Sequence, residues 1–446
     1  MLARPKIAPP AWHCMCIVSG STQAHSTVPG TYSAQANATT RTRTQNSMSL
    51  EVPEERPLKC PKSPTHPEAP FNVVESAAKR LLLAVGGGPD KPYGLANIHA
   101  CAGSLLSIAT GKAEEELRQA LGVQHAKQLE ILKNPFRKTV VLLDPDADKV
   151  LNQTEKGRNA LAVWKELETT CMVLEENVEG QVNDLVKPIL QLKEDLFEPN
   201  SLKTPGATTL AVMLAMERIK VEHNCVLPHY VHDKFSTPNG PVDAIYASDP
   251  KRDMKFKNIE LCTMVLVESK PDGNDHRSLC FILPKDDRTP LEDCLVNLAE
   301  TVRREGGLYM NGTRKFDFRF PKFDATLSLE SIVGLLKEYA GVSSIFDEGQ
   351  CPFTDALPTE LTELEEAFVG KFLHFASFKA DRKGAEAKAV TAATVCAYRS
   401  MSAHAPPEKF YCDRKFAVIL ANGEDDKFSP EFVLKVEGGC LDLKAE

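Results

Sequence analysis

Apolar residues recur with two different spacings along this chain, and the change in spacing divides it into a helical part and a strand-rich part. In the first part they fall three and four residues apart, which is the period of a helix that packs on a core. Glycines follow two of these stretches, at Gly86 to Gly88 and at Gly122, and glycine commonly ends a helix. The pattern predicts helices over residues 71–85, 100–109, 110–122, 156–167 and 178–190.

Short apolar or alternating runs dominate the later part and predict strands. Two of them, residues 261–268 and 278–284, flank a polar turn and predict a hairpin. Residues 329–341 predict one more helix, stopped by Gly341, whereas residues 210–215 fit a strand or a helix equally well. Helices early and strands late, without regular alternation, indicate an α+β protein with mostly antiparallel sheets. The other expected strands are residues 140–143, 315–323, 368–378, 415–422 and 431–438.

The segment from Gly384 to Met401, GAEAKAVTAATVCAYRSM, is open to two interpretations. As a strand it would place small side chains on one face, since successive residues point to opposite faces. Ala, Glu and Lys are also strong helix formers, so an Ala-rich surface helix fits the same residues. The small face of the strand would consist of Ala385, Ala387, Ala389, Thr391 and Ala393, with Glu386 and Lys388 on the other face.

The composition is that of an ordinary globular protein, with 42% hydrophobic and 26% charged residues in a chain of 446. This length allows one large or two ordinary domains. A formal net charge of -8 argues against a general nucleic-acid binder. There is no apolar run of the length of about 18 residues that a membrane helix needs. We therefore expect neither a nucleic-acid nor a membrane partner.

The first 70 residues differ from the rest. The stretch from Ser19 to Pro70 is rich in Thr, Ser, Pro and Ala and poor in large apolar residues, so residues 1–70 are expected to form a disordered N-terminal arm. The stretch before it is not a good secretion signal, because Pro9 and Pro10 interrupt it. Met48 lies inside the arm and is a candidate alternative start. Residues 71–446 form the expected folded domain.

Side chains that carry chemistry are scattered. The 13 cysteines contain no CxxC pair, only the CxC of Cys14 and Cys16, so free thiols and no metal site are expected. The motifs of zinc proteases, α/β-hydrolases, P-loop proteins and dinucleotide-binding proteins are absent, which argues against an enzyme and against a cofactor. His374 lies within an apolar strand and is expected to be a core histidine, and His223 with Cys225 makes an unconvincing catalytic pair. A thiol enzyme using Cys396 is a third alternative.

Several segments resemble the serpins, a family of serine protease inhibitors that use a suicide loop. Near the C-terminus the resemblance is carried by KFLHFASF, KADRKGAEAKAVTAAT and FYCDRKFAVILAN. Upstream it continues through SLCFILPKDD and GSLLSIATGKAEEELRQALGV, in the family's order, over residues 71–438. The positions that match the family's C-terminal pattern are Gly384, Glu386, Ala387, Ala389, Thr391, Phe410, Asp413 and Phe416.

The resemblance implies a fold, a function and a set of residues. The fold would be α+β, a serpin-like, mostly antiparallel multi-sheet domain with about eight or nine helices and an exposed reactive loop near the C-terminus. The function would be serine-type endopeptidase inhibition by loop cleavage, acyl-enzyme trapping and insertion of the loop as a strand. The partner would be a chymotrypsin-like or trypsin-like serine protease, and the inhibitor an extracellular monomer. The hinge of the loop would be Gly384, Ala385, Glu386, Ala387, Ala389 and Thr391, and the gate histidine His374.

The family's spacing also locates the cleaved bond. It puts the bond after the fourteenth residue beyond Gly384, which is Tyr398. A loop one residue longer would use Arg399 and Ser400 instead. Tyr398 suits an apolar, chymotrypsin-like pocket, whereas Arg399 suits an acidic, trypsin-like pocket.

Some positions depart from the family's pattern. Arg382 and Lys383 stand where an acidic pair precedes the hinge glycine, and residues 94–100 lack the serines at the start of the second helix. The asparagine of the central strand is replaced near Met216, and the usual partners of His374 are missing. These positions surround the point where the sheet opens, so the alternative is a non-inhibitory serpin that serves as a binding or carrier protein.

Overall fold

Most helices lie in the first half of the chain, as the spacing of apolar residues predicts. The computed structural model describes residues 12–21, 73–123, 128, 137–205, 207–270, 276–350, 352–358, 366–385, 407–423 and 425–443, all within the unit formed by residues 1–22 and 71–446. The expected helix ends are confirmed at Gly122 and Gly341, which both adopt the left-handed conformation that favours glycine. The helices within these residues are α1 (Val73–Val85), α2 (Leu95–Ile108), α3 (Gly111–Leu121), α4 (Pro145–Gln153), α5 (Glu155–Glu166), α6 (Val178–Leu190), α7 (Leu291–Glu305) and α8 (Val333–Leu335).

Eight strands form the first sheet, which we call sheet A. Their order is β4-β3-β5-β1-β13-β14-β6, and β12 also pairs with β13. The pairs are antiparallel except for β3 with β4. The strands are β1 (Trp12–Ser21), β3 (Arg137–Leu143), β4 (Thr170–Val173), β5 (Ala207–Glu217), β6 (Val221–Glu222), β12 (Phe323–Ser331), β13 (Glu366–Ala380) and β14 (Gly384–Ala385).

Nine strands form the second sheet, sheet B. Their order is β15-β11-β8-β9-β10-β16-β17-β2, and β7 pairs with β8. The predicted hairpin is confirmed as β9 and β10, and the only parallel pair among the described strands of this sheet joins β11 to β15. The strands are β2 (Pro92–Gly94), β7 (His229–Thr237), β8 (Gly240–Asn258), β9 (Cys262–Glu268), β10 (Arg277–Pro284), β11 (Gly312–Pro321), β15 (Glu408–Tyr411), β16 (Phe416–Asn422) and β17 (Ser429–Val436).

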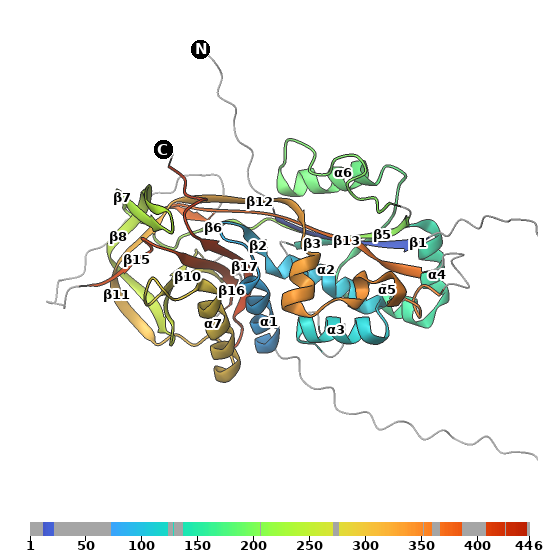
Figure 1. The fold of residues 1–446 in the computed structure, drawn as a ribbon, viewed down its shortest axis with the longest axis horizontal. Coiled ribbons are helices and arrows are strands. Elements are labelled where there is room, and N and C mark those ends of the chain that lie inside the picture. Colours follow the sequence, from blue (N-terminus) through green and yellow to red (C-terminus); the bar gives the residue numbers. More distant parts are fainter. Residues whose placement is uncertain are drawn as a thin grey trace, which may run out of the picture. The chain divides into compact units, whose positions relative to one another are not determined.

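Sheet A is covered on both faces (Figure 1). Helix α6 lies on one face, where alternate residues of β3 and β5 such as Leu142 and Leu214 pack against it. Helices α2 to α5 lie on the other face, and the intervening residues such as Val141 and Met213 belong to the main core. Because strand residues alternate between faces, one run of buried residues serves both layers.

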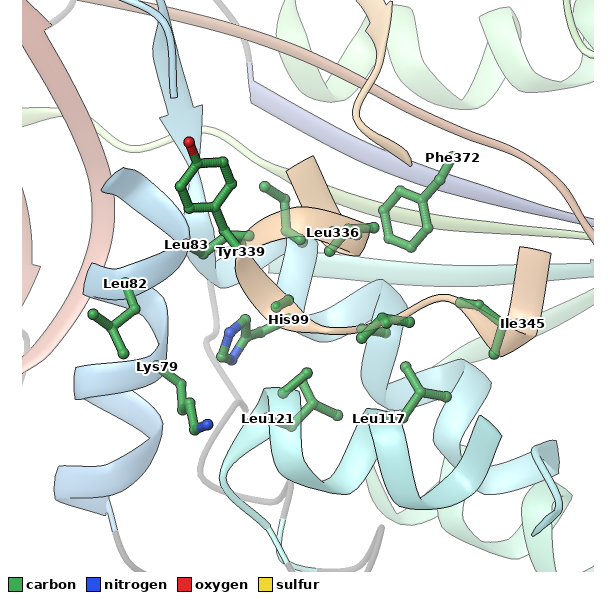
Figure 2. Close-up of a pocket in the computed structure, with 15 residues that line it drawn as sticks. Lys79, Leu82, Leu83, His99, Leu117, Leu121, Leu336, Tyr339, Ile345 and Phe372 are labelled. Carbon is green, nitrogen blue, oxygen red and sulfur yellow. The ribbon is translucent and has the colours of Figure 1, made fainter. Parts of the chain in front are cut away.

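A small cavity lies between α1, α2, α3 and the turn Leu336–Ala340 that follows α8 (Figure 2). Its volume is about 40 Å³, close to that of one or two water molecules. His99 lines it and accepts a hydrogen bond from Arg80, Nε to Nδ1, of 3.3 Å. Burial, with the neighbouring Arg80 and Arg137, lowers the pKa of His99 well below its usual value, so this histidine is neutral at pH 7.

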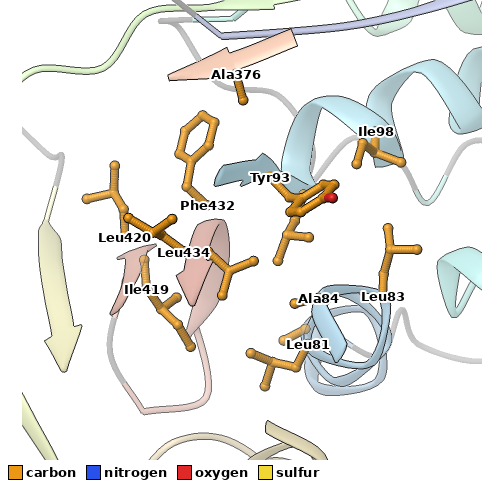
Figure 3. Packing of buried hydrophobic residues seen from close by; sticks show 14 of the residues in the cluster. Leu81, Leu83, Ala84, Tyr93, Ile98, Ala376, Ile419, Leu420, Phe432 and Leu434 are labelled. Carbon is orange, nitrogen blue, oxygen red and sulfur yellow. The ribbon is translucent and has the colours of Figure 1, made fainter. Parts of the chain in front are cut away.

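Helix α1 packs against sheet B in the main core. Figure 3 shows Leu81 and Leu83 of α1 close to Tyr93 and to Leu434 of sheet B. All four side chains are almost completely buried. Tyr93 lies in β2, the strand of sheet B that directly precedes α2.

Two segments differ from their predicted boundaries. The helix expected over residues 329–341 begins only at Val333, because Glu330 and Ser331 still pair with β13 as part of β12. Residues 210–215, which fitted a helix or a strand, lie in β5, where β3 and β1 bond to both of its edges.

One part of the N-terminal arm differs from the prediction that residues 1–70 are disordered. Residues 12–21 were expected to be disordered together with the rest of 1–70, yet they form β1 in the middle of sheet A. The prediction considered the composition of the arm alone, whereas a strand is stabilised by the backbone of its neighbours. The rest of the arm lies outside the described residues.

Three further findings concern membrane helices, metal sites and cysteines. In the part of the chain that the structure describes, no helix is long and apolar enough to cross a membrane. The same residues contain no group of three or more His, Cys, Asp or Glu side chains arranged to hold a metal ion. The described cysteines with placed side chains are free thiols.

Candidate functional site

The first two residues of the candidate loop form strand β14 at one end of sheet A. Ala385 pairs with Ala380 of β13 and with Val221 of β6, and its side chain is buried. A Cβ atom on Gly384 would lie 2.2 Å from the carbonyl oxygen of Val221. Glycine is therefore needed here because two backbones approach closely, a reason that the sequence did not reveal.

A tight turn delivers the chain into β14. The carboxylate of Asp381 accepts hydrogen bonds from the backbone N–H groups of Lys383 and Gly384, at 2.7 and 3.2 Å. The backbone N–H of Asp381 donates in return to the carbonyl of Gly384, at 2.9 Å. This turn holds the start of the candidate loop, although Arg382 and Lys383 stand where the serpin pattern has an acidic pair.

His223 fastens the turn to the end of β6. Its backbone N–H donates to the carbonyl of Lys383, at 3.0 Å, and its ring Nε2 lies 3.1 Å from the carbonyl of Asp381. Since a carbonyl oxygen only accepts, Nε2 carries the hydrogen. The ring is 1% exposed, and burial, helped by Arg252, lowers the pKa of His223 to about 4. The sequence singled out His223 only as a partner for Cys225, which is exposed.

His374, the candidate gate residue, lies in β13 and is completely buried. Its Nε2 accepts a hydrogen bond from the backbone N–H of Gly94, at 3.1 Å. Its ring stacks on Tyr93, with ring centres 6.1 Å apart. The histidine thus ties the middle of sheet A to the start of α2.

A buried ion pair lies at the hinge end of the same sheet. Nη2 of Arg137, in β3, is 3.1 Å from Oε2 of Glu217, the last residue of β5, and both side chains are almost fully buried. Nε of Arg137 also donates to Oδ1 of Asn97 in α2, at 2.9 Å. Burial raises the pKa of Glu217, and the charge of Arg137 opposes that change. The sequence did not single out any of these three residues.

The space between β5 and β13 holds strand β1. β1 runs antiparallel to both neighbours, with His13 opposite Met216 on one side and Phe375 on the other. β14 is also antiparallel to both of its neighbours, and it too has β13 on one side. β14 and β1 therefore follow each other in the same gap of sheet A, which we call the slot.

The comparisons with known proteins agree with this topology. A family model described as "Serpin (serine protease inhibitor)" matches residues 238–428. The match spans 191 of the 446 residues, and this part of the chain is similar to the serpins. Serpins are in general inhibitors of serine proteases rather than catalysts.

A curated relative of this chain is the Drosophila melanogaster protein "Serine protease inhibitor 88Ea", which is 33% identical over 154 residues. The match covers 34% of this chain and about a third, 33%, of the length of that relative.

Solved structures show the same fold. The Arabidopsis AtSerpin1 structure in its native stressed conformation has a TM-score of 0.60 at 14% identity and covers 83% of this chain and 99% of the other. Thyroxine-binding globulin in complex with thyroxine has a TM-score of 0.56 at 16% identity and covers 83% and 99%. The expected serpin-like α+β fold is thereby confirmed.

The structure describes only part of the residues expected to act. It describes Gly384 and Ala385 of the expected hinge and His374, the expected gate residue, and it places Gly384 and Ala385 at the end of the slot. The other expected loop residues lie outside the described part of the chain. These are Glu386, Ala387, Ala389, Thr391, Tyr398, Arg399 and Ser400.

Proposed function

We propose that this chain is a serpin and that it inhibits a chymotrypsin-like or trypsin-like serine protease. The protease serine attacks the loop and forms an acyl-enzyme. The freed loop then enters the slot between β5 and β13 as a new strand and carries the bound protease with it. The observation that carries the proposal is the start of that strand: β14 already pairs with β13 and with β6 at the end of the slot.

The alternation of the loop supports insertion. Ala385 faces the core, where it pairs with the buried Ala380. Because residues of a strand alternate between faces, Ala387, Ala389 and Thr391 would follow on the same face as the loop inserts. Small side chains fit between packed strands and the helices beneath them at little steric cost.

The test is the formation of an SDS-stable complex. The serpin is incubated with trypsin-, chymotrypsin- and elastase-like proteases, and mass spectrometry identifies the cleaved bond. Cleavage after Tyr398 is expected with a chymotrypsin-like enzyme and cleavage after Arg399 with a trypsin-like one. Cleavage of the loop by every protease without any stable complex would refute inhibition.

A matched pair of loop variants separates insertion from simple cleavage. Thr391→Arg places a charge on the face that must become buried and is expected to abolish the complex while the loop is still cut. Lys388→Arg changes the opposite face and is expected to leave complex formation unchanged. Equal complex formation by both variants would contradict insertion.

The second candidate is a non-inhibitory serpin that binds or carries a ligand. Two observations favour this function. Strand β1 already fills the slot that an inserting loop would need, and thyroxine-binding globulin is a structural neighbour that binds thyroxine. The cavity of Figure 2 is too small for such a role, since ligand pockets have volumes of about 300–1,000 Å³. Nicking the loop near Tyr398 distinguishes the two functions, because only an inserting loop raises the melting temperature by a large amount.

Two further parts of the proposal concern the location of the protein and its oligomeric state. We place the serpin outside the cell, where proteins of this family are often found, and we expect it to act as a monomer. Detection of the protein in the medium of expressing cells tests the first expectation. Light scattering of the purified chain tests the second.

A further inference from the structure

Strand β1 occupies the slot that the cleaved loop would have to enter. We propose that β1 is an intramolecular regulator, a segment of this chain that competes with the reactive loop for one binding site between β5 and β13. This inference rests on the proposed function, because it concerns the same slot. Residues 12–21 belong neither to the reactive loop nor to the segments that resemble the serpins.

The registers of β14 and β1 define the competition residue by residue. Ala385 pairs with Ala380, and each further loop residue would move one position back along β13. Residue 390 would then lie opposite Phe375, the partner of His13, and residue 391 opposite His374, the partner of Cys14. A loop in the slot would therefore place residue 390 where His13 lies.

The other edge of the slot gives the same result. Ala385 pairs with Val221 on that side, so that residue 389 would lie opposite Glu217, the partner of Trp12. Counted from there, the ten residues of β1 take the places of loop residues 389–398. Both edges thus agree, and the last displaced position is that of Tyr398, the candidate residue before the cleaved bond.

The loop can consequently insert only a short way while β1 is in place. Residues 386–388 have room between β14 and β1, and residue 389 meets the end of β1. Insertion beyond residue 388 requires β1 to leave. The chain from residue 22 to residue 72 that follows β1 is long enough to permit this, since an extended chain spans about 3.3 Å per residue.

The strand pairing of β1 is also the pairing that an inserted loop would make. It pairs with β5 along residues 12–21 and with β13 along residues 13–21, antiparallel to both, so its backbone has the direction that the loop would adopt. Each pairing contains one register shift, at Val18/Ser19 against β5 and at Ile17/Val18 against β13. Bulges of this kind disturb the ladder locally, which makes β1 easier to displace than a regular strand.

The expected behaviour of the full-length chain follows. β1 leaves the slot only part of the time, so the full-length chain traps a fraction of the attacking protease. In the remaining encounters the protease cuts the loop and is released before insertion is complete, and the serpin is consumed as a substrate. Removal of β1 from the slot, by cleavage within residues 23–70 or by synthesis from Met48, converts the same loop into an efficient trap.

A reversible lock tests the competition in the full-length protein. Ala215 pairs directly with Cys14, so Ala215→Cys sets two thiols opposite each other in neighbouring strands. Paired residues of antiparallel strands have Cα atoms about 4.5–5.5 Å apart, within the range that a disulfide spans. Oxidised glutathione accepts the two electrons and two protons of the thiols, which yields the disulfide and two molecules of reduced glutathione. Cys14→Ser in the same background is the matched control.

The effect of the disulfide is measured as the amount of SDS-stable complex. The oxidised Ala215→Cys protein is expected to form at least tenfold less SDS-stable complex than the same protein after reduction and removal of the reductant. The Cys14→Ser/Ala215→Cys control is expected to respond to neither treatment. Peptide mapping must find a disulfide between Cys14 and the thiol introduced at position 215. Failure of this disulfide to form, or equal trapping by the oxidised and reduced protein, would overturn the proposal.

A second variant opens the slot. Ile17→Pro removes a backbone donor in the middle of a strand that is bonded on both sides. Thr44→Pro, in the arm beyond β1, is its control. A labelled peptide of residues 385–398 is expected to bind Ile17→Pro at least tenfold more tightly than wild type or Thr44→Pro, and to show no binding to the oxidised Ala215→Cys protein. Equal binding to all four proteins would overturn the assignment.

The peptide assay separates this inference from the proposed function. If no variant traps a protease but the peptide still binds only the Ile17→Pro protein, inhibition fails and the competition for the slot stands. If wild type, the locked protein and Ile17→Pro all trap a protease equally, inhibition stands and the role of β1 fails. The lock carries the test alone if Ile17→Pro does not fold.

Discussion

Protonation of His223 is expected to weaken the fold at the hinge, because its ring is buried beside the turn that leads into β14. The ordinary pKa of histidine is 6.5, and burial lowers the pKa of His223 to about 4. The unfolded chain therefore binds a proton between these two values that the folded chain does not bind. For a group with a lowered basic pKa, stability is complete above pH 6.5 and is lost as the pH falls towards 4.

The size of the loss follows from the two pKa values. A difference of one pKa unit corresponds to about 1.4 kcal/mol of differential proton binding. His223 should therefore cost the folded state about 2 kcal/mol at pH 5 and about 3 kcal/mol at pH 4. The positive charge of Arg252 contributes to this cost, since it repels the protonated ring.

The perturbation is His223→Leu. At pH 7 the variant loses the hydrogen bond to the carbonyl of Asp381 and is expected to be about 1 kcal/mol less stable than wild type. As the pH falls, only the wild type is destabilised by protonation at this site. The free energies of unfolding of the two proteins should therefore cross between about pH 5 and pH 6, below which the variant is the more stable.

Urea unfolding followed by tryptophan fluorescence measures both free energies, at pH 7, 6, 5 and 4. His232→Leu, a substitution at an exposed position of β7, is the matched control and should follow the wild type throughout. All other titrating groups contribute equally to the free energy of unfolding of the two proteins, so their contributions cancel in the difference. A constant difference between wild type and His223→Leu from pH 7 to pH 4 would refute the reasoning.

Three further changes have expected outcomes. Glu217→Ala leaves the guanidinium of Arg137 buried without its carboxylate and should lower the free energy of unfolding in urea by about 3–5 kcal/mol. Gly384→Val places a side chain against the carbonyl oxygen of Val221, so β14 should separate from β6 and the amide of Ala385 should exchange at least about tenfold faster, equivalent to about 1.4 kcal/mol. Phe281→Ala removes a buried ring that packs against other phenylalanines and should cost about 3–5 kcal/mol in the same urea experiment.

Each change has its own control. Replacement of both Arg137 and Glu217 by Met should restore most of the lost stability, and a double variant as unstable as Glu217→Ala would contradict a buried-charge effect. Gly334→Val, at a glycine with open space around it, should leave the exchange of Ala385 unchanged. Phe281→Leu retains most of the volume and should cost clearly less than Phe281→Ala, so equal losses would argue against packing as the cause.

The local pattern of the chain predicted most of the elements around the site. The helical period located α1, α3 and α6 within a few residues, and the alternating runs located β10, β13 and β16. The alternation from Gly384 onward identified a face of small side chains, and the buried Ala385 lies on that face. Such predictions succeed because period and alternation are properties of neighbouring residues in the chain.

The contacts that hold the hinge could not be predicted in this way. His223 bonds the carbonyl of Asp381 across 158 positions of sequence, and Arg137 meets Glu217 across 80. Nothing in the residues beside His223 marks it as a partner of the turn. The same holds for Glu217, which ends the apolar strand β5 and is buried where β3 brings Arg137 beside it.

The order of residues alone predicts early helices, late strands and, if residues 384–401 form a strand, one face of small side chains. The resemblance to the serpins is carried by those segments. What fills the slot between β5 and β13 is established only in the folded chain. The apolar run at residues 14–18 is short and fits a strand or a helix equally well, so that β1 depends on backbone groups that two distant strands supply. Strand pairing is a property of the edges that meet, and those edges exist only once the sheet has formed.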